Sequence, residues 1–396
     1  DEMEPGTFKD RVLIHADPHM LIEGMIIEGY SARAEKGIIF IRPEYEGAAR
    51  ILDREIENAK AAGYLGNNIL DSGYNFDIVV HRSGGRYICG EVTAQINALE
   101  GKRPNPKQPP PYATEKGLWG QPTVAHNVET LFCIPNIIRN GSEWFRNLAL
   151  TETGSGTKIF CVSGKVNRPG CYELPMGIRL SEIIETYAGG MKGGGEFKAC
   201  LPGGASTAFL PAEFYDIEMD FETMKKAGHR LGTGAIMVFD HKTCLVEATL
   251  NLTEFFARES CGWCTPCREG FPYMRDLLWR LEHGQGQEEF ILTLKQMCRH
   301  LWNSYCAFAP GGVAPAHRPR RSRGHPAHAG GHRCRRHRRG HRRASPGEQR
   351  SRPGLAAGGS GGRPCGFLHP WGCDSDLGKD NGGAETASES FGLADR

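Results

Sequence analysis

The sequence of 396 residues lacks any long apolar run and any secretory start. No stretch approaches the roughly 18 apolar residues that a membrane-spanning helix needs, and stretches such as 37–41 and 235–239 have only the length of buried strands. The first residues are acidic, whereas a signal peptide begins with basic and then apolar residues. These absences argue against a transmembrane or secreted protein, and we expect no direct membrane span.

A large excess of charge of either sign is also missing, because 48 basic residues offset 46 acidic ones. The charges are unevenly distributed. Residues 317–396 hold 16 of the basic residues but only 7 of the acidic ones, which leaves residues 1–316 with a net charge of −7. Arg, His, Gly and Pro dominate this end and apolar periodicity is lost, so we expect a disordered basic tail over 316–396. A shifted reading frame would produce such a composition.

Cysteine, in contrast, is abundant, with 14 residues. Without a secretory signal they do not indicate a disulfide scaffold. Six are scattered singly, as small core residues are: Cys89, Cys133, Cys161, Cys171, Cys200 and Cys244. Three others lie within seven residues, and this clustering indicates metal binding in a reducing compartment.

Cys261, Cys264 and Cys267 follow one another at intervals of three. Zinc sites usually combine two separated Cys-x-x-Cys pairs, whereas three evenly spaced cysteines followed by Pro or Arg suit three corners of an iron–sulfur cluster. The motif therefore predicts such a cluster, with zinc and free structural cysteines as the alternatives.

The fourth ligand must come from a remote position. Cys306 is the preferred candidate, because it lies 39 positions after Cys267, beyond two expected helices that could fold back as a hairpin. Cys298 is the competitor, although helical spacing directs it toward the core beside Leu294. Arg268 would offset the charge of an anionic cluster and could donate hydrogen bonds to it.

The order of apolar segments predicts three folded parts. Residues 1–150 alternate helices (17–30 and 44–62) with apolar strands (38–41 and 76–80), which favours a largely parallel α/β sheet. The five prolines of 104–111 exclude helix and central strand, so this segment should be a surface loop.

The other two parts differ in their pattern. Residues 155–240 predict a small α+β module with strands at 158–162 and 170–174 around a turn, followed by a short helix at 180–187. Residues 250–302 are predicted to be helical over 252–259, 271–283 and 288–301.

The motifs together resemble a known family. Residues 259–270 resemble the cluster loop of the NADH-binding flavoproteins of respiratory complex I, which are the F subunits of NADH-quinone oxidoreductase. The opening residues 1–11 and the segments 86–91, 120–123 and 127–130 resemble further motifs of that family. The resemblance covers about residues 1–315 in order. It implies an α/β flavin/NADH-binding domain over 1–150, a β-grasp-like module over 155–240 and a helical 4Fe-4S domain over 250–315.

The resemblance also implies an enzymatic activity and partners. In this family NADH gives a hydride to FMN, and single electrons then leave through a 4Fe-4S cluster toward quinone. The implied partners are the other subunits of a respiratory NADH dehydrogenase complex, including a small iron–sulfur subunit. The implied location is cytoplasmic and peripheral, on the inner face of the cell membrane or on the matrix side.

Cofactor-binding residues are implied at eight positions: Asp1, Glu2, Glu4, Gly90, Glu91, Tyr112, Asn127 and Thr130. The first two would hydrogen-bond the flavin and the third would contact the nicotinamide nucleotide, since ribityl and ribose hydroxyls need acceptors. The two residues at 90 and 91 would line the flavin pocket, and those at 127 and 130 would contact the flavin or its phosphate. The aromatic ring at 112 would stack on adenine. No catalytic residue is assigned.

Each assignment has a structural alternative. The acidic residues 1–4 could be a solvated segment, and Glu91 could interact with the dipole of a following helix. Asn127 could cap a helix, and Tyr112 could simply pack.

The sequence also departs from the family. The Gly-rich loop that cradles the FMN phosphate would lie upstream of Asp1, so we expect a truncated chain with doubtful activity and weak FMN binding on its own. Val92 replaces a second Glu expected near NADH, and His126 replaces an Asn.

Two other functions are weighed. The diaphorase subunit of an NAD-linked hydrogenase or formate dehydrogenase shares these motifs. A protein that binds nucleic acid through the 13 Arg of 317–352 is the weaker alternative, because that segment lacks interleaved aromatic residues and a folded motif, and phosphate attraction alone would be nonspecific.

Overall fold

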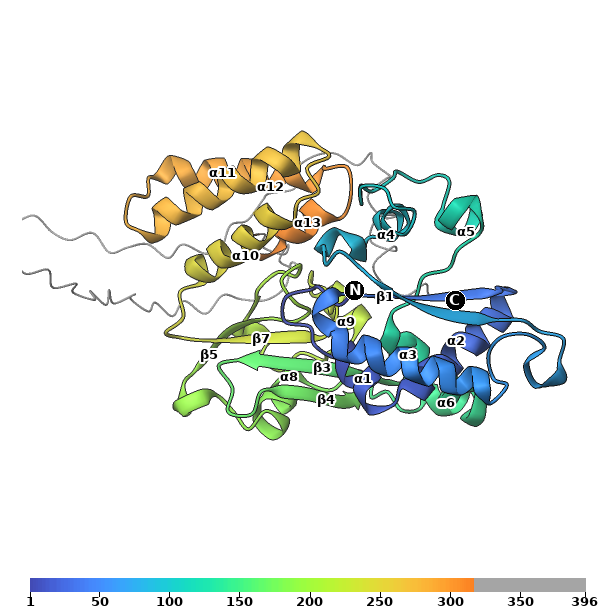
Figure 1. The fold of residues 1–396 in the computed structure, drawn as a ribbon. Coiled ribbons are helices and arrows are strands. Elements are labelled where there is room, and N and C mark those ends of the chain that lie inside the picture. The colour runs from blue at the N-terminus through green and yellow to red at the C-terminus, as the bar shows by residue number, and fades with distance from the viewer. Residues whose placement is uncertain (317–396) are drawn as a thin grey trace, which may run out of the picture. The chain divides into compact units, whose positions relative to one another are not determined.

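The computed structural model describes residues 1–316, which form three groups of elements (Figure 1). The expected basic tail, together with the nucleic-acid interpretation that depends on it, lies outside the described residues.

The first group is built around a short parallel sheet. Its strands are β1 (Lys36–Ile41) and β2 (Asp77–Arg82), which pair in parallel as expected. Its helices are α1 (Asp10–Ala16), α2 (Pro18–Ala32), α3 (Glu46–Ala61), α4 (Val92–Leu99), α5 (Ala113–Lys116), α6 (Val128–Asn140) and α7 (Ser142–Arg146). Asp17 caps α2, because its Oδ1 accepts the N–H of Met20 at 3.0 Å. The stretch from Glu100 to Tyr112 contains neither helix nor strand, which confirms the proline-rich loop.

Helices α2 and α6 approach each other closely at a glycine. A Cβ atom added to Gly24 of α2 would lie 2.1 Å from the carbonyl oxygen of Leu131 in α6. Pro135 stands four residues after Leu131 and has no N–H to donate to that carbonyl. The carbonyl is therefore available to the Cα–H of the neighbouring helix, which explains why glycine is required there.

The second group is a five-stranded sheet with short helical segments. Its strands are β3 (Thr157–Gly164), β4 (Gly170–Pro175), β5 (Phe197–Leu201), β6 (Leu210–Pro211) and β7 (Ala235–Asp240), in the order β4-β3-β7-β5-β6. Only β3 and β7 pair in parallel. The expected helix at 180–187 is one α turn (α8, Leu180–Glu182) that continues as a π turn (Ile183–Tyr187), and α9 spans Phe221–Lys226. Alternate residues of β3, such as Phe160 and Val162, are fully buried in the core of this module.

The third group is helical: α10 (Leu245–Glu259), α11 (Thr265–Glu282), α12 (Glu288–Trp302) and α13 (Phe308–Val313). Helices α11 and α12 form the expected hairpin (Figure 1). Two helix starts were predicted too late, at 252 and 271 instead of Leu245 and Thr265. The second difference matters, because Cys267 lies inside α11 and not in a loop.

One apolar core joins residues from all three groups. It contains Phe40 and Ile88 from the first group, Leu201 from the sheet module, and Phe256 and Phe271 from the helices. Among residues 1–316, no helix is both long enough and apolar enough to cross a bilayer.

Candidate functional site

Four thiols approach one another where helix α11 begins. Cys261 lies in the short connection after α10, Cys264 directly precedes α11, and Cys267 lies in its first turn. Cys306 comes from the segment between α12 and α13. The thiols of Cys267 and Cys306 each lie within electrostatic range of the other and of both remaining thiols. The structure thus brings the four predicted ligands together.

The buried members of this group do not ionise easily. Burial, and then repulsion from the neighbouring thiolates, together raise the pKa of Cys267 and that of Cys306 to about 12. Several thiolates at this place need a positively charged centre to balance them, and soft sulfur donors select iron–sulfur chemistry. The residues present therefore fit a cluster.

The arrangement is not that of a single-ion site. Within residues 1–316, no three His, Cys, Asp or Glu side chains converge as one metal ion would require. A 4Fe-4S cluster takes each thiolate on a different iron atom, so its ligands need not converge on one point. Cys298, the competing ligand, lies on α12 and is buried in the apolar core beside Leu294, as the helical spacing predicted.

The backbone around the thiols is held by local hydrogen bonds. The hydroxyl of Ser260 lies 3.2 Å from the sulfur of Cys267 and accepts the N–H of Gly262 at 3.3 Å. Gly262 has a φ of +77°, which favours glycine. Arg268 donates to the carbonyl of Gly262 at 3.1 Å and to Glu269 at 2.8 Å. Together with the N-terminal end of the 18-residue helix α11, it places positive charge beside the thiols.

The acidic residues at the start of the described chain are ordered and not a solvated segment. The carboxylate of Asp1 accepts the hydroxyl of Ser83 at 2.8 Å. Glu2 is buried, and its oxygens accept the backbone N–H of Asp10 at 2.8 Å and the hydroxyl of Tyr45 at 2.9 Å. Burial raises the pKa of Glu2. This carboxylate anchors the first turn of α1.

Glu4 links the first group to the sheet module. Its carboxylate accepts the hydroxyl of Tyr87 at 2.5 Å and the backbone N–H of Ser206 at 2.6 Å. Burial raises its pKa, and these two donors partly oppose the increase. A Cβ atom on Gly204 would lie 2.5 Å from the Glu4 side chain, so this glycine makes room for the carboxylate.

Residues 87–90 form a 3₁₀ turn that ends at Glu91. Glu91 caps α4, because its carboxylate accepts the N–H of Thr93 at 3.2 Å and that of Ala94 at 2.9 Å. The local alternative of a helix-end contact is thus what the structure shows, with Glu91 as the cap itself. Gly90 beside it is exposed.

The turn at 87–91 lies against the segments that carry the thiols. The backbone N–H of Tyr87 donates to Glu259 Oε2 at 3.1 Å, two residues before Cys261. The Glu91 carboxylate lies close enough to Cys306 to raise the pKa of that thiol. Sequence reasoning missed Tyr87 and Glu259 as site residues, although both stood inside or beside motifs that carried the resemblance.

Asn127 caps α6, because its Oδ1 accepts the N–H of Glu129 at 3.0 Å. The same oxygen accepts the ammonium of Lys9 at 2.7 Å, so the local alternative for Asn127 is confirmed. Lys9 is itself buried, and no pattern in the sequence marked it. Thr130 is half-buried in the first turn of α6.

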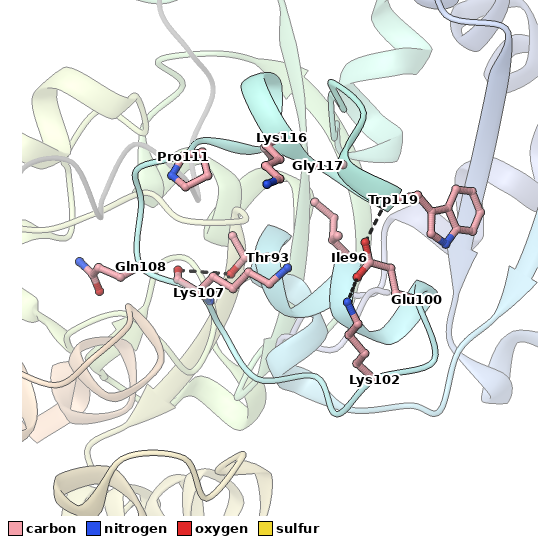
Figure 2. A pocket seen from close by; sticks show the side chains of 12 residues that line it. Thr93, Ile96, Glu100, Lys102, Lys107, Gln108, Pro111, Lys116, Gly117 and Trp119 are labelled. Carbon is pink, nitrogen blue, oxygen red and sulfur yellow. Dashed lines mark hydrogen bonds and ion pairs between the residues drawn. The ribbon is translucent and has the colours of Figure 1, made fainter.

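Tyr112 stands apart from these residues, with 48% of its surface exposed, at the end of the proline-rich loop. A cavity of about 620 Å³ lies beside this loop, between α4, α5 and the turn at Trp119 (Figure 2). Three lysines line it, and Glu100 accepts Lys102 at 2.6 Å and the N–H of Trp119 at 2.8 Å. None of the predicted cofactor residues lines this cavity.

Three family descriptions match the chain. Residues 1–136 match the Nuo51 FMN-binding domain, residues 159–209 the SLBB domain, and residues 247–320 the NADH-ubiquinone oxidoreductase-F iron–sulfur binding region.

Curated relatives cover the same residues. The F subunits of NADH-quinone oxidoreductase from Salmonella typhimurium and Escherichia coli are each 51% identical over 317 residues, which is 80% of this chain and 71% of the relative. The F subunit numbered 2 of Rhizobium meliloti is 45% identical over 314 residues, 79% of this chain and 74% of the relative. Among solved structures, an NAD+-reducing NiFe hydrogenase chain is similar with a TM-score of 0.71 and 35% identity. The match covers 80% of this chain and about half (52%) of that one.

Proposed function

Because the chain belongs to the family of the F subunits of NADH-quinone oxidoreductase, we propose that it takes electrons from NADH beside the turn at 87–91 and passes them on through the four-thiol group. When bound, FMN accepts two electrons together and releases them singly, and a 4Fe-4S cluster accepts one at a time. The chain is thus part of an oxidoreductase, and the proposal concerns which of its residues bind the flavin, the nucleotide and the cluster.

The observation that carries the proposal is the contact between the turn at 87–91 and the segment that carries the thiols. Glu4 and Tyr87 form one hydrogen-bonded pair, and Tyr87 also donates to Glu259 at the entrance to the cysteine segment. Glu91 lies within electrostatic range of Cys306. A flavin in contact with this turn would therefore be close to the thiols, which short-range electron transfer requires.

The acidic residues have distinct proposed roles. Glu2 is buried and accepts several protein donors, whereas Asp1 and Glu4 are only half-buried, so the role of Glu2 is to hold the segment that presents its neighbours. The carboxylates of Asp1 and Glu4 would accept hydroxyl groups of the flavin and the nucleotide. Gly90, Asn127 and Thr130 would add flavin contacts, and Tyr112 would stack on adenine.

We assign the cluster to Cys261, Cys264, Cys267 and Cys306. The test is a set of Cys-to-Ala variants, purified anaerobically and assayed for iron and for the paramagnetic signal of the reduced protein. Cys264→Ala and Cys306→Ala should lose both, while the matched controls Cys244→Ala and Cys298→Ala should keep them. Loss of the cluster only in Cys298→Ala would overturn the ligand assignment, and bound zinc without iron would overturn the cluster.

A second assay tests the direction of electron flow. With FMN supplied, the chain should reduce ferricyanide with NADH, and Cys306→Ala should keep this flavin-level activity but fail to reduce the cluster. Loss of both activities in a folded variant would contradict a separate flavin step.

Belonging to this family implies partner subunits. We propose that one is a small iron–sulfur protein and that the complex holds the chain at the inner face of the cell membrane, or on the matrix side. We also propose domain limits of 1–150, 155–240 and 250–315. Co-purification of the tagged chain, with identification of the retained subunits by mass spectrometry, tests the partners.

The alternative, a diaphorase component of a hydrogenase, is favoured by one observation, the similarity to the NAD+-reducing hydrogenase chain. Co-purification with a nickel-containing protein, and NAD+ reduction by hydrogen, would support it. Retention of subunits that couple NADH oxidation to quinone would reject it.

A further inference from the structure

A pair of cysteines outside the cluster group lies where two strands of the sheet module face each other. Cys161 of β3 is directly opposite Cys171 of β4, and their sulfur atoms are 3.8 Å apart. The N–H of Cys161 donates to Gly234 at 3.1 Å, on the side away from β4. In an antiparallel pair this makes the two cysteines a non-hydrogen-bonded pair, for which Cα atoms are typically about 4.5 Å apart. That spacing falls within the range of disulfides.

The pair faces away from the core of its module and against the segment after Glu4. Its strand neighbours Phe160 and Val162 point into the core, so the cysteines occupy the other face. There the N–H of Phe8 donates to the Cys161 sulfur at 3.3 Å, and the Cys171 thiol donates to the Phe8 carbonyl at 3.7 Å. The two thiols thus hold the backbone of the segment that carries the acidic residues.

The two thiols differ in access. Cys161 is fully buried, whereas Cys171 is partly exposed. The pKa of Cys171 is lowered, chiefly because the Cys161 thiol donates a hydrogen bond to it. Burial and the charge of Glu2 oppose this effect, and the cations of Lys9 and Arg11 add to it. A partly exposed thiol of lowered pKa next to a second thiol is the usual arrangement of a reactive and a resolving cysteine.

We propose that Cys161 and Cys171 are a reversible modification site, at which a low-molecular-weight disulfide oxidises them to a cross-strand disulfide. The Cys171 thiolate attacks one sulfur of the small disulfide, whose S–S bond breaks and releases one thiolate. Cys161 then loses its proton and attacks the sulfur of Cys171, which releases the second small thiolate. Both electrons of the oxidation reside in the two small thiols, and the protein gains one S–S bond.

Oxidation would also change the contact with Phe8. A disulfide has no S–H, so the hydrogen bond from Cys171 to the Phe8 carbonyl would be lost. We therefore expect the backbone around Phe8 to exchange amide hydrogen faster in the oxidised protein, while the cluster ligands stay unchanged.

The experiment uses the full chain with its cluster, purified anaerobically and equilibrated with mixtures of oxidised and reduced glutathione. Remaining thiols are alkylated and the protein is digested with trypsin. Cleavage after Lys158, Lys165 and Arg179 separates the two cysteines into peptides 159–165 and 166–179, because the Arg168–Pro169 bond resists trypsin. The expected product is these two peptides joined and lighter by two hydrogens than the reduced pair, and dithiothreitol should separate them.

Variants test the assigned order. In Cys161→Ser, Cys171 should stop as its glutathione adduct, and in Cys171→Ser, Cys161 should stay reduced because it is buried. Cys133→Ser is the matched control, and its cross-link should equal that of the native chain. A native chain that stops at the Cys171 adduct, or keeps both thiols alkylatable while other cysteines oxidise, would overturn the proposal. Because the native chain itself gives this answer, the test does not depend on the folding of a variant.

Discussion

At the scale of single residues, Lys9 and His229 are two polar side chains whose burial has testable consequences. Lys9 is 3% exposed, and its ammonium contacts Asp10 at 2.5 Å, Asn127 at 2.7 Å and Glu129 at 3.1 Å. These partners offset the cost of removing the charge from water. The ammonium groups of Lys158 and Lys9 in turn hold the pKa of Glu129 below its usual value, although burial acts to raise it.

Replacing Lys9 tests this network. Lys9→Met should lower the free energy of unfolding by about 3–5 kcal/mol, because it leaves buried carboxylates without their cation. Lys60→Met is the control, since Lys60 is a surface partner of Glu57 and Asp77 at 3.1 Å, and such pairs contribute about 0–1 kcal/mol. Urea unfolding at neutral pH measures both, and equal losses would contradict the role of burial.

His229 is 3% exposed, and within the described residues neither ring nitrogen has a hydrogen-bond partner. Burial lowers its pKa from 6.5 to about 4. As the pH falls below 6.5, the unfolded chain binds the proton first, so stability is lost progressively, by roughly 3 kcal/mol in total at about pH 4. His229→Gln should flatten this part of the stability–pH curve, whereas the exposed His241→Gln should not. An unchanged slope in His229→Gln would refute the assignment.

At the scale of elements, helix α13 depends on a glycine. A Cβ atom at Gly312 would lie 2.4 Å from the ring of Phe271 and 2.8 Å from that of Phe256. Gly312→Ala should therefore cost about 1–3 kcal/mol and, because α13 begins two residues after Cys306, should also lower iron retention. In α3 the nearest atom to a Cβ at Gly47 is 3.8 Å away, so Gly47→Ala should instead gain about 0.5–1 kcal/mol. Thermal unfolding and iron content measure both; a stable, iron-replete Gly312→Ala protein would contradict the packing.

The elements also show how far the sequence could be used for prediction. The apolar runs of the sequence predict the ends of β1 and β2 to within two residues, because buried strands are made of apolar residues. The start of α11 was missed, since its first turn contains cysteines and a proline with no apolar period. Pro266 is nevertheless a favourable first-turn residue. The cysteine spacing identified the cluster segment, but only the fold shows that Cys267 belongs to a helix.

At the scale of the whole molecule, Phe256 stands at the centre of the core shared by the three groups. It is fully buried and contacts the rings of Tyr87, Phe271 and Phe308. Phe256→Ala should lower stability by about 3–5 kcal/mol. Because the core is shared, far-UV circular dichroism and cluster absorbance should report one common transition. Two separate transitions in the native chain would show that the groups unfold independently.

Contacts between distant segments could not be predicted from the sequence. Cys161 and Cys171 were interpreted as single core residues, because their pairing depends on a strand register that one residue of slippage would abolish. Likewise, nothing local to Glu2 indicates that it accepts the N–H of Asp10 and the hydroxyl of Tyr45. The order of the three domains, in contrast, could be predicted, because each has its own apolar pattern.

The separation of Cys306 from the other thiols has a consequence for how the protein is made. A cluster on these four cysteines would close a loop of 39 positions between Cys267 and Cys306. Such a cross-link removes chain entropy from the unfolded state worth roughly 4 kcal/mol. At synthesis rates of about 5–20 residues per second, the fourth sulfur leaves the ribosome roughly 2–8 s after the third. Cluster insertion therefore has to wait until the α11–α12 hairpin exists to carry Cys306 back.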